Sequence, residues 1–242
     1  MRKKEPSMPT QRTLAAIVDA NPHATRVLED YQLDYCCGGT RTLQDACAER
    51  GIDPSAVLAE IELLDDTTQP TWARLSAREL VDHIETTHHR YLHRELPRLT
   101  ALANKVASVH GPHHPELYRV TATYSELRLD LEPHLLKEEN VLFPMIRQLS
   151  DAATSPTVRR GVINNPISMM RVEHDRAGEL LATLRETTEG YKIPANVCAS
   201  YTALYAGLAE LEADTHLHVH LENNVLFPAV LAADAKVQEV SS

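Results

Sequence analysis

Apolar residues recur every three to four positions over most of this chain, and that spacing predicts helices rather than strands. From residue 75 onwards the pattern gives four long helical segments. We expect these helices to span residues of about 76 to 107, 115 to 149, 166 to 190 and 195 to 231, because Gly and Pro residues between these ranges end one helix or start the next. Four helices joined by modest loops predict an all-α fold with an up-down four-helix bundle.

A region of shorter helices precedes the bundle. Residues 12–64 hold brief apolar periodic segments on both sides of a compact turn, Asp34-Tyr35-Cys36-Cys37-Gly38-Gly39. We expect 12–64 to form a small helical domain with vicinal cysteines, 65–74 a linker, and 75–232 the bundle. Residues 1–11 are expected to be a disordered tail, and 233–242 a frayed one.

Composition narrows the class of protein. A formal net charge of -10 argues against nucleic acid or an anionic membrane as a partner. Four cysteines are too few for a disulfide scaffold, and the N-terminal stretch lacks the apolar core of a secretory signal, so we expect a cytoplasmic protein. The unusual feature is 13 histidines beside two phenylalanines, which requires a chemical explanation.

An internal repeat locates the candidate site. The segment from His134 to Pro144 aligns without gaps with the segment from His218 to Pro228, 84 residues later, and each contains His-x-x-x-Glu and one Phe. Residues i and i+4 share one face of a helix, so each His can reach a metal together with its Glu. The alignment selects Glu138 over its neighbour Glu139, and it selects Glu222 as the equivalent residue.

The other two helices each supply one further histidine. His89 and His174 lie 85 residues apart, and counting residues along antiparallel helices brings His89 level with His134. The fourth helix fits less well, because His218 lies too far from Pro194. Either that helix overhangs its neighbour or the stretch from Tyr191 to Val197 is not helical.

This ligand set suits two metals. Four imidazoles and two carboxylates exceed the needs of one tetrahedral zinc, and carboxylates buried without a cation would be costly. Imidazole with carboxylate fits iron, although manganese and zinc stay open. The predicted ligands are His89, His134, Glu138, His174, His218 and Glu222.

The two His-x-x-x-Glu-x-x-Val-Leu-Phe-Pro segments, with His89 and His174, resemble the hemerythrin-like bundles. Together with the Cys-Cys-Gly-Gly turn upstream, residues 12 to 232 resemble the di-iron family known as repair of iron centres proteins. The resemblance implies two non-haem irons bridged by Glu138 and Glu222; an additional oxo or hydroxo bridge stays open. It also implies repair of iron–sulfur clusters damaged by nitrosative or oxidative stress, with damaged iron–sulfur proteins as partners.

Further residues are candidates for supporting roles. Cys36 and Cys37 are expected to be free thiols for redox chemistry or iron transfer, whereas Cys47 and Cys198 are expected in the core. Glu173 and Asp130 are candidates to orient imidazoles or relay protons from outside the ligand shell. Asp130 lies where the family often has glutamate, and Pro133 should remove a helical hydrogen bond beside His134.

Other functions stay open at this point. One alternative is reduction or scavenging of nitric oxide at the iron pair, and another is an oxygen- or nitric-oxide-binding module. Both give the same small gases, nitric oxide and oxygen, as partners. Formation of a homodimer also stays open.

The repeat makes a first prediction. Glu138→Leu or Glu222→Leu should lose the bridged metal pair, while His216→Ala should keep it, because His216 points away from the face that carries His218. Elemental analysis of protein purified under low oxygen measures this as metal per chain. Equal metal loss in the His216 variant would contradict the assignment.

Overall fold

The computed structural model describes residues 9–64, 70–151 and 162–239. Its helices confirm the all-α class, and no strand occurs within these three ranges. Part of each predicted tail and of the linker lies outside the described residues. Within the described part, Pro9–Gln11 and Thr71–Arg74 form short 3-10 helices, and the last helix continues to Glu239 instead of fraying at 233. Ala and charged residues, with no Gly or Pro, sustain that extension.

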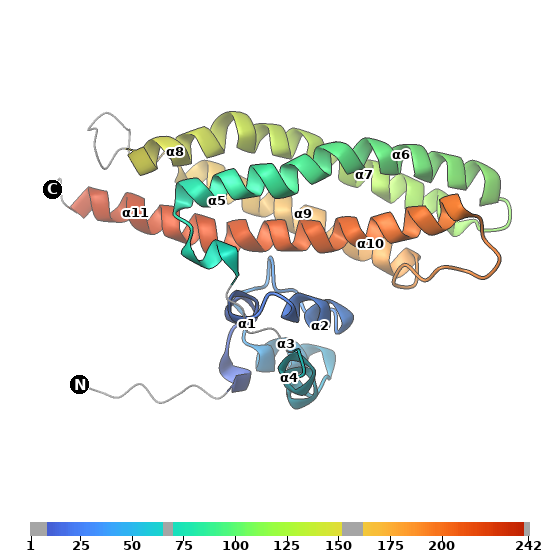
Figure 1. Ribbon diagram of the computed structural model, residues 1–242, viewed down its shortest axis with the longest axis horizontal. Helices are drawn as coiled ribbons and strands as arrows, with labels where there is room; N and C mark the ends of the chain where they lie inside the picture. The colour runs from blue at the N-terminus through green and yellow to red at the C-terminus, as the bar shows by residue number, and fades with distance from the viewer. Residues whose placement is uncertain (1–8, 65–69, 152–161, 240–242) are drawn as a thin grey trace.

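Four short helices form a small layer on one side of the bundle (Figure 1). They are α1 (Leu14–Ala20), α2 (Ala24–Asp30), α3 (Leu43–Arg50) and α4 (Pro54–Glu62). The side chains of Thr13, Thr42 and Asp53 accept hydrogen bonds from first-turn amides and so fix three of the helix starts. Buried apolar residues hold the layer together, and Val219 of the bundle joins this cluster.

In the part of the chain that the structure describes, the bundle has four long helical runs, and a π-helical turn interrupts three of them. The first run is α5 (Ala77–Ile84), η3 (Glu85–His89) and α6 (Arg90–His110); the second is α7 (Glu116–Lys137), η4 (Glu138–Leu142) and α8 (Phe143–Asp151). The third is α9 (Asn164–Thr187), and the fourth is α10 (Ala199–His220), η6 (Leu221–Leu226) and α11 (Phe227–Glu239). A capping box formed by Ser76 and Glu79 starts the first run.

The fourth run resolves the mismatch in length. Residues 191–198 are not helical and α10 begins at Ala199, which is the second of the two alternatives. The third run also differs at its start: α9 begins at Asn164, and Pro166 lies inside its first turn, where no amide donor is required.

Two apolar clusters fill the bundle on either side of its middle. One joins α6, α7, α9 and α10, and the other joins α5, α8, α11 and the first half of α9. The layer between them is where the polar ligand candidates lie. No helix of the described residues is long and apolar enough to cross a membrane.

The small layer touches the bundle through the loop between α2 and α3, which reaches towards the junction of α10 and α11 (Figure 1). Gly39 is required there, because a Cβ on it would lie 2.5 Å from the carbonyl oxygen of Tyr35 and 2.7 Å from Oδ1 of Asn224. Any larger residue must move this loop away from the bundle.

We therefore predict that Gly39→Ala lowers the free energy of unfolding by about 1–3 kcal/mol, the usual cost of forcing atoms into a packed site. Urea unfolding measures this. The matched control is Gly178→Ala in α9, where an added Cβ meets nothing within 4 Å and should stabilise the helix by about 0.5–1 kcal/mol. Equal stability changes in the two variants would show that the contact at Gly39 is not tight.

Candidate metal centre

Six polar side chains converge between the two apolar clusters of the bundle. All are buried, with at most 3% of each exposed: His89, His134, Glu138, His174, His218 and Glu222. These are the six residues selected by the repeat and its half-repeat. Each of the four helical runs contributes at least one of them.

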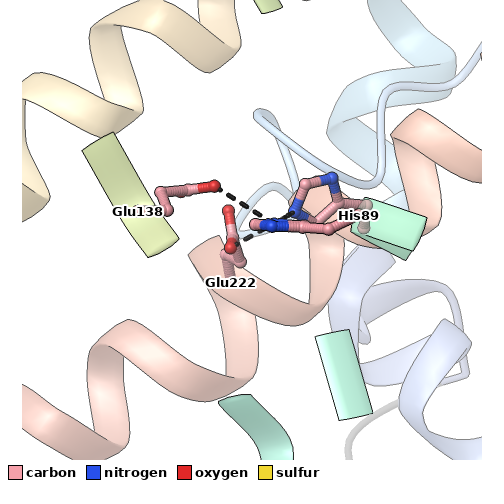
Figure 2. Close-up of side chains that lie close together, drawn as sticks. His89, Glu138 and Glu222 are labelled. Atoms are coloured by element: carbon pink, nitrogen blue, oxygen red, sulfur yellow. Dashed lines mark hydrogen bonds and ion pairs between the residues drawn. The ribbon is translucent and has the colours of Figure 1, made fainter. Parts of the chain in front are cut away.

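The six side chains form two groups of four that share both carboxylates. One group is His89, His218, Glu138 and Glu222, and the other is His134, His174, Glu138 and Glu222; within each group the ligand atoms all lie within 4.8 Å of one another. Figure 2 shows Glu138 and Glu222 pointing towards His89. These two overlapping groups can hold two cations side by side, and each cation would contact two imidazoles and both glutamates.

The imidazole nitrogens that face the carboxylates are all Nε2. Those of His89 and His134 lie 3.4 Å from Oε2 of Glu138. Those of His174 and His218 lie 3.1 and 3.3 Å from oxygens of Glu222. Histidines also approach each other in pairs, with Nε2 atoms 3.3 Å apart between His89 and His218 and 3.2 Å apart between His174 and His134.

Three π-helical turns position these residues. His89 ends η3, Glu138 begins η4, and Glu222 is the second residue of η6. A π turn accommodates one extra residue in the helix and so re-aims side chains, and π turns occur frequently at functional sites. The α-helical i,i+4 spacing of His and Glu was therefore only an approximate guide to a geometry that each π turn adjusts.

The surroundings favour the neutral form of His89 and His134 and place two carboxylates side by side in the bundle interior. Burial, reinforced by His218, lowers the pKa of His89 to about 2, and burial with His174 lowers the pKa of His134 to about 4. Burial and the nearby Glu222 raise the pKa of Glu138 well above its usual value. Burial opposes ionisation of Glu222 too, but His218 and His174 outweigh it and hold that pKa well below the usual value.

The residues present fit a metal. Both oxygens of Glu138 and both of Glu222 are buried and accept no hydrogen bond from the described residues. Such acceptors are costly to bury unless they are satisfied, and a cation would satisfy all four. Neutral imidazole, which burial favours at His89 and His134, is the form of histidine that ligates metals.

Three of the four imidazoles have a hydrogen-bond partner at Nδ1, on the side of the ring away from the carboxylates. Glu139 lies 2.9 Å from Nδ1 of His89, Glu173 lies 2.9 Å from Nδ1 of His134, and Asn223 lies 3.0 Å from Nδ1 of His174. A partner at Nδ1 fixes the tautomer and ring orientation and leaves Nε2 free to ligate. Glu173 was expected in such a role, whereas Glu139 and Asn223 were not. All three directly adjoin a predicted ligand in the sequence, and that position was the one sequence feature that could have identified them.

His218 is held differently. Its Nδ1 has no hydrogen-bond partner within the described ranges, and its ring stacks on that of His88 with centroids 5.5 Å apart. His88 is itself fixed by Asp214, 2.9 Å from its Nδ1. Sequence reasoning missed His88 because the neighbouring His89 carried the half-repeat.

Asp130 does not orient an imidazole in this structure. Its side chain is 48% exposed and forms an ion pair with Arg176 at 3.6 Å. Among the described residues its ion-pair partner is thus Arg176 and not an imidazole, and the other predicted role, proton relay, stays a prediction. The shorter side chain ends at the surface of a small cavity that His134, His174 and His218 also line.

The two histidines that the repeat left aside face the small layer. His216 lies 3.7 Å from Glu29, and the ring nitrogens of His220 lie 3.0 Å from Asp19 and 3.3 Å from the carbonyl of Tyr35. Asn224 donates a hydrogen bond of 2.9 Å to the carbonyl of Cys36. The same segment therefore places Glu222 in the metal centre and, on its other side, contacts the Cys-Cys turn of the small layer.

The four cysteines occupy distinct settings. Cys36 is buried and Cys37 is partly exposed, and Cys47 lies in the core of the small layer as expected. The Cys37 thiol, burial and Asp34 raise the pKa of Cys36 well above its usual value. The expectation for Cys198 was wrong: it is exposed at the start of α10, with its Sγ 3.1 Å from Nε2 of His110.

Fold and site together define a helical-bundle protein with a buried histidine–carboxylate centre suited to cations. Residues 59–230 match the hemerythrin HHE cation binding domain, and the chain belongs to this family. Residues 10–65 match a second family model, a domain of unknown function, DUF542.

Full-length relatives share both parts. A protein of Haemophilus influenzae named "Probable iron-sulfur cluster repair protein" is 36% identical over 229 residues, covering 91% of this chain and 97% of the relative. Proteins named "Iron-sulfur cluster repair protein YtfE" are 37% identical in Enterobacter sp. (91% of this chain, 97% of the relative) and 37% identical in Citrobacter koseri (88% and 93%).

The partners behind the imidazoles give a prediction. Glu139→Ala should weaken binding of ferrous iron about 10–100-fold, because it releases the ring of His89. Asp130→Ala is the matched control and should leave the affinity within about twofold, since Asp130 contacts Arg176 instead of a ligand. Competition with a coloured chelator measures both. Equal weakening would show that general surface charge, and not ring orientation, sets the affinity.

Proposed function

We propose that the centre holds two non-haem irons bridged by Glu138 and Glu222. His89 and His218 would complete one site, and His134 and His174 the other. Support comes from the two groups of four ligand atoms that share both carboxylates, and from the four carboxylate oxygens that lack another partner among the described residues. Bound iron would supply open coordination positions and one-electron chemistry.

The protein's own residues prepare the site for loading. Burial keeps His89 and His134 neutral at physiological pH, so no proton must leave these rings before iron binds. Glu139, Glu173 and Asn223 hold three rings in place. The proton favoured on Glu138 by burial must leave when iron enters, so loading is coupled to proton release.

We further propose that the protein repairs iron–sulfur clusters damaged by nitrosative or oxidative stress, by supplying iron. The observation that carries this is the direct contact between the metal-bearing segment and the Cys-Cys turn, the 2.9 Å hydrogen bond from Asn224 to Cys36. A carrier or sensor of oxygen or nitric oxide does not need a thiol turn attached to its metal site. The names of the relatives, which match over both parts, agree with repair.

The test uses protein loaded with iron-57. An iron–sulfur enzyme is damaged with nitric oxide, the excess gas is removed, and the loaded protein is added with a reductant. We expect enzyme activity to return and the label to appear in the rebuilt cluster by Mössbauer spectroscopy. Glu222→Gln protein, which cannot hold the pair, should restore no activity.

Other outcomes separate the alternatives. Recovery without label in the cluster would contradict the supply of iron. Reduction of nitric oxide at the iron pair is the second candidate function, and the small cavity of about 10 Å³ beside His134, His174 and His218 is at the lower size limit for one water-sized molecule. Nitrous oxide formed over many turnovers, without cluster recovery, would establish that alternative function.

A further inference from the structure

The turn between α2 and α3 brings a second set of metal-ligand atoms together. Asp34, Cys36 and Cys37 place a carboxylate oxygen and two sulfurs within 4.8 Å of one another. The two Sγ atoms are 3.9 Å apart, and Oδ1 of Asp34 lies 3.2 Å from Sγ of Cys36. This set lies outside the bundle centre and shares no residue with it.

The separations suit a shared cation better than a disulfide. A tetrahedral metal with sulfur bonds of about 2.3 Å has ligand atoms about 3.8 Å apart, close to the observed distance between the sulfurs. A disulfide requires about 2.05 Å. The thiol proton of Cys36 now lies between its sulfur and Asp34, and a cation that replaced it would satisfy both atoms.

The turn is held in this shape by its own backbone. The Asp34 carboxylate accepts hydrogen bonds from the amides of Cys36, Cys37 and Gly38 at 2.9 to 3.1 Å. Asn224 holds the carbonyl of Cys36 from the bundle side. The three ligand groups are therefore arranged before any cation arrives, which reduces the entropy that binding would cost.

The surroundings favour a cation over an anionic ligand. The turn lines a cleft of about 790 Å³ between the small layer and the bundle. The cleft is also lined by two arginines and one histidine, and Arg185 is paired with Glu212 at 2.8 Å. Its carboxylates outnumber its cationic groups: Glu29, Asp34, Asp175, Glu179, Glu186, Glu189 and Glu212. Such a lining raises the local concentration of cations and repels anionic thiols such as glutathione.

We propose that Asp34, Cys36 and Cys37 form a second metal site, which binds a divalent first-row cation that accepts thiolate ligands. In the repair function proposed above, on which this role rests, the cation is ferrous iron passing between the cleft and a client. Each thiol that ligates releases its proton to solvent. Three protein ligands leave a fourth position for a donor from the cleft, as a transfer site requires.

The two proposed metal sites differ in burial and in ligand type, as transfer of a metal from one to the other requires. The bundle centre is fully buried and offers only nitrogen and oxygen ligands. The thiol site is partly exposed at Cys37, faces the cleft and offers sulfur. Sulfur ligands match the chemistry of an iron–sulfur client, so this site can present the metal in a ligand environment close to its destination.

Cobalt(II) is the probe for this proposal. Full-length protein with iron already in the bundle centre is titrated with cobalt(II) under anaerobic conditions, with the thiols reduced. We expect near-ultraviolet absorption from thiolate-to-cobalt charge transfer that saturates at about one cobalt per chain. Cys37→Ser, a change at a partly exposed position, should lose most of this absorption, and Cys36→Ser/Cys37→Ser should lose all of it.

Matched controls identify the thiols responsible. Cys47→Ser removes the other thiol of the small layer, and Cys198→Ser removes the exposed thiol beside His110; both should keep the absorption. Circular dichroism and iron content verify that each variant is folded and loaded. No absorption in the wild-type protein, or absorption that survives in the double variant, would overturn the proposal.

The readouts also separate this proposal from the repair function. Cluster recovery with iron-57 label, but no cobalt–thiolate absorption, would leave repair standing and refute the thiol site. Cobalt–thiolate absorption without cluster recovery would support the site as a metal ligand set and refute its role in repair.

Discussion

Burial of two carboxylates in the middle of a helical bundle is the constraint on which the rest of this structure depends. Glu138 and Glu222 are fully buried and receive no hydrogen bond from the described residues. A single ionised carboxylate in an apolar interior costs several kcal/mol even after relaxation, and two adjacent ones repel each other as well. Only a cation, or protons shared with nearby imidazoles, offsets this cost. The shift of the two glutamate pKa values in opposite directions expresses that conflict.

Much of the local architecture follows from that pair. The four imidazoles must meet at one level, and three π-helical turns supply the adjustment that regular helices lack. The rings must also be fixed, which explains the acceptors behind His89, His134 and His174 and the stacked His88 behind His218. Two apolar clusters close the layer from either end and keep the local dielectric low, which strengthens every interaction inside it.

The periodic signals in the sequence were enough to predict the bundle and the convergence of the six side chains. The ungapped repeat contained two His-Glu pairs, and counting residues placed His89 level with His134. What sequence could not provide was local departure from regular geometry. A π turn has no strong residue signature, so the shapes of η3, η4 and η6 were not foreseen. The length of the fourth helix was ambiguous for the related reason that residues 191–198 lack a decisive break after Pro194.

Side chains that depend on tertiary contacts were the other limit. Asp130 and Glu173 looked equivalent in sequence, yet Arg176 engages Asp130 while His134 engages Glu173. Glu139 was set aside as a ligand, and the same reasoning concealed its contact with His89. Cys198 had the pattern of a core thiol, but the non-helical stretch before α10 leaves it exposed. For Asp130, Glu173 and Glu139 the deciding neighbour comes from another helix, and for Cys198 the cause is a break in the helix; periodicity within one helix identifies neither.

The short segment from Val219 to Asn224 connects the two parts of the molecule. Glu222 points into the metal centre, while Val219 packs in the core of the small layer, His220 contacts Tyr35 and Asn224 holds Cys36. Part of this segment is π-helical, and π turns occur frequently at functional sites. Any rearrangement of Glu222 that accompanies metal binding must therefore be shared with the contacts of the thiol turn. This connection supports the proposed transfer of metal between the buried centre and the thiol turn, because the same short segment contacts both.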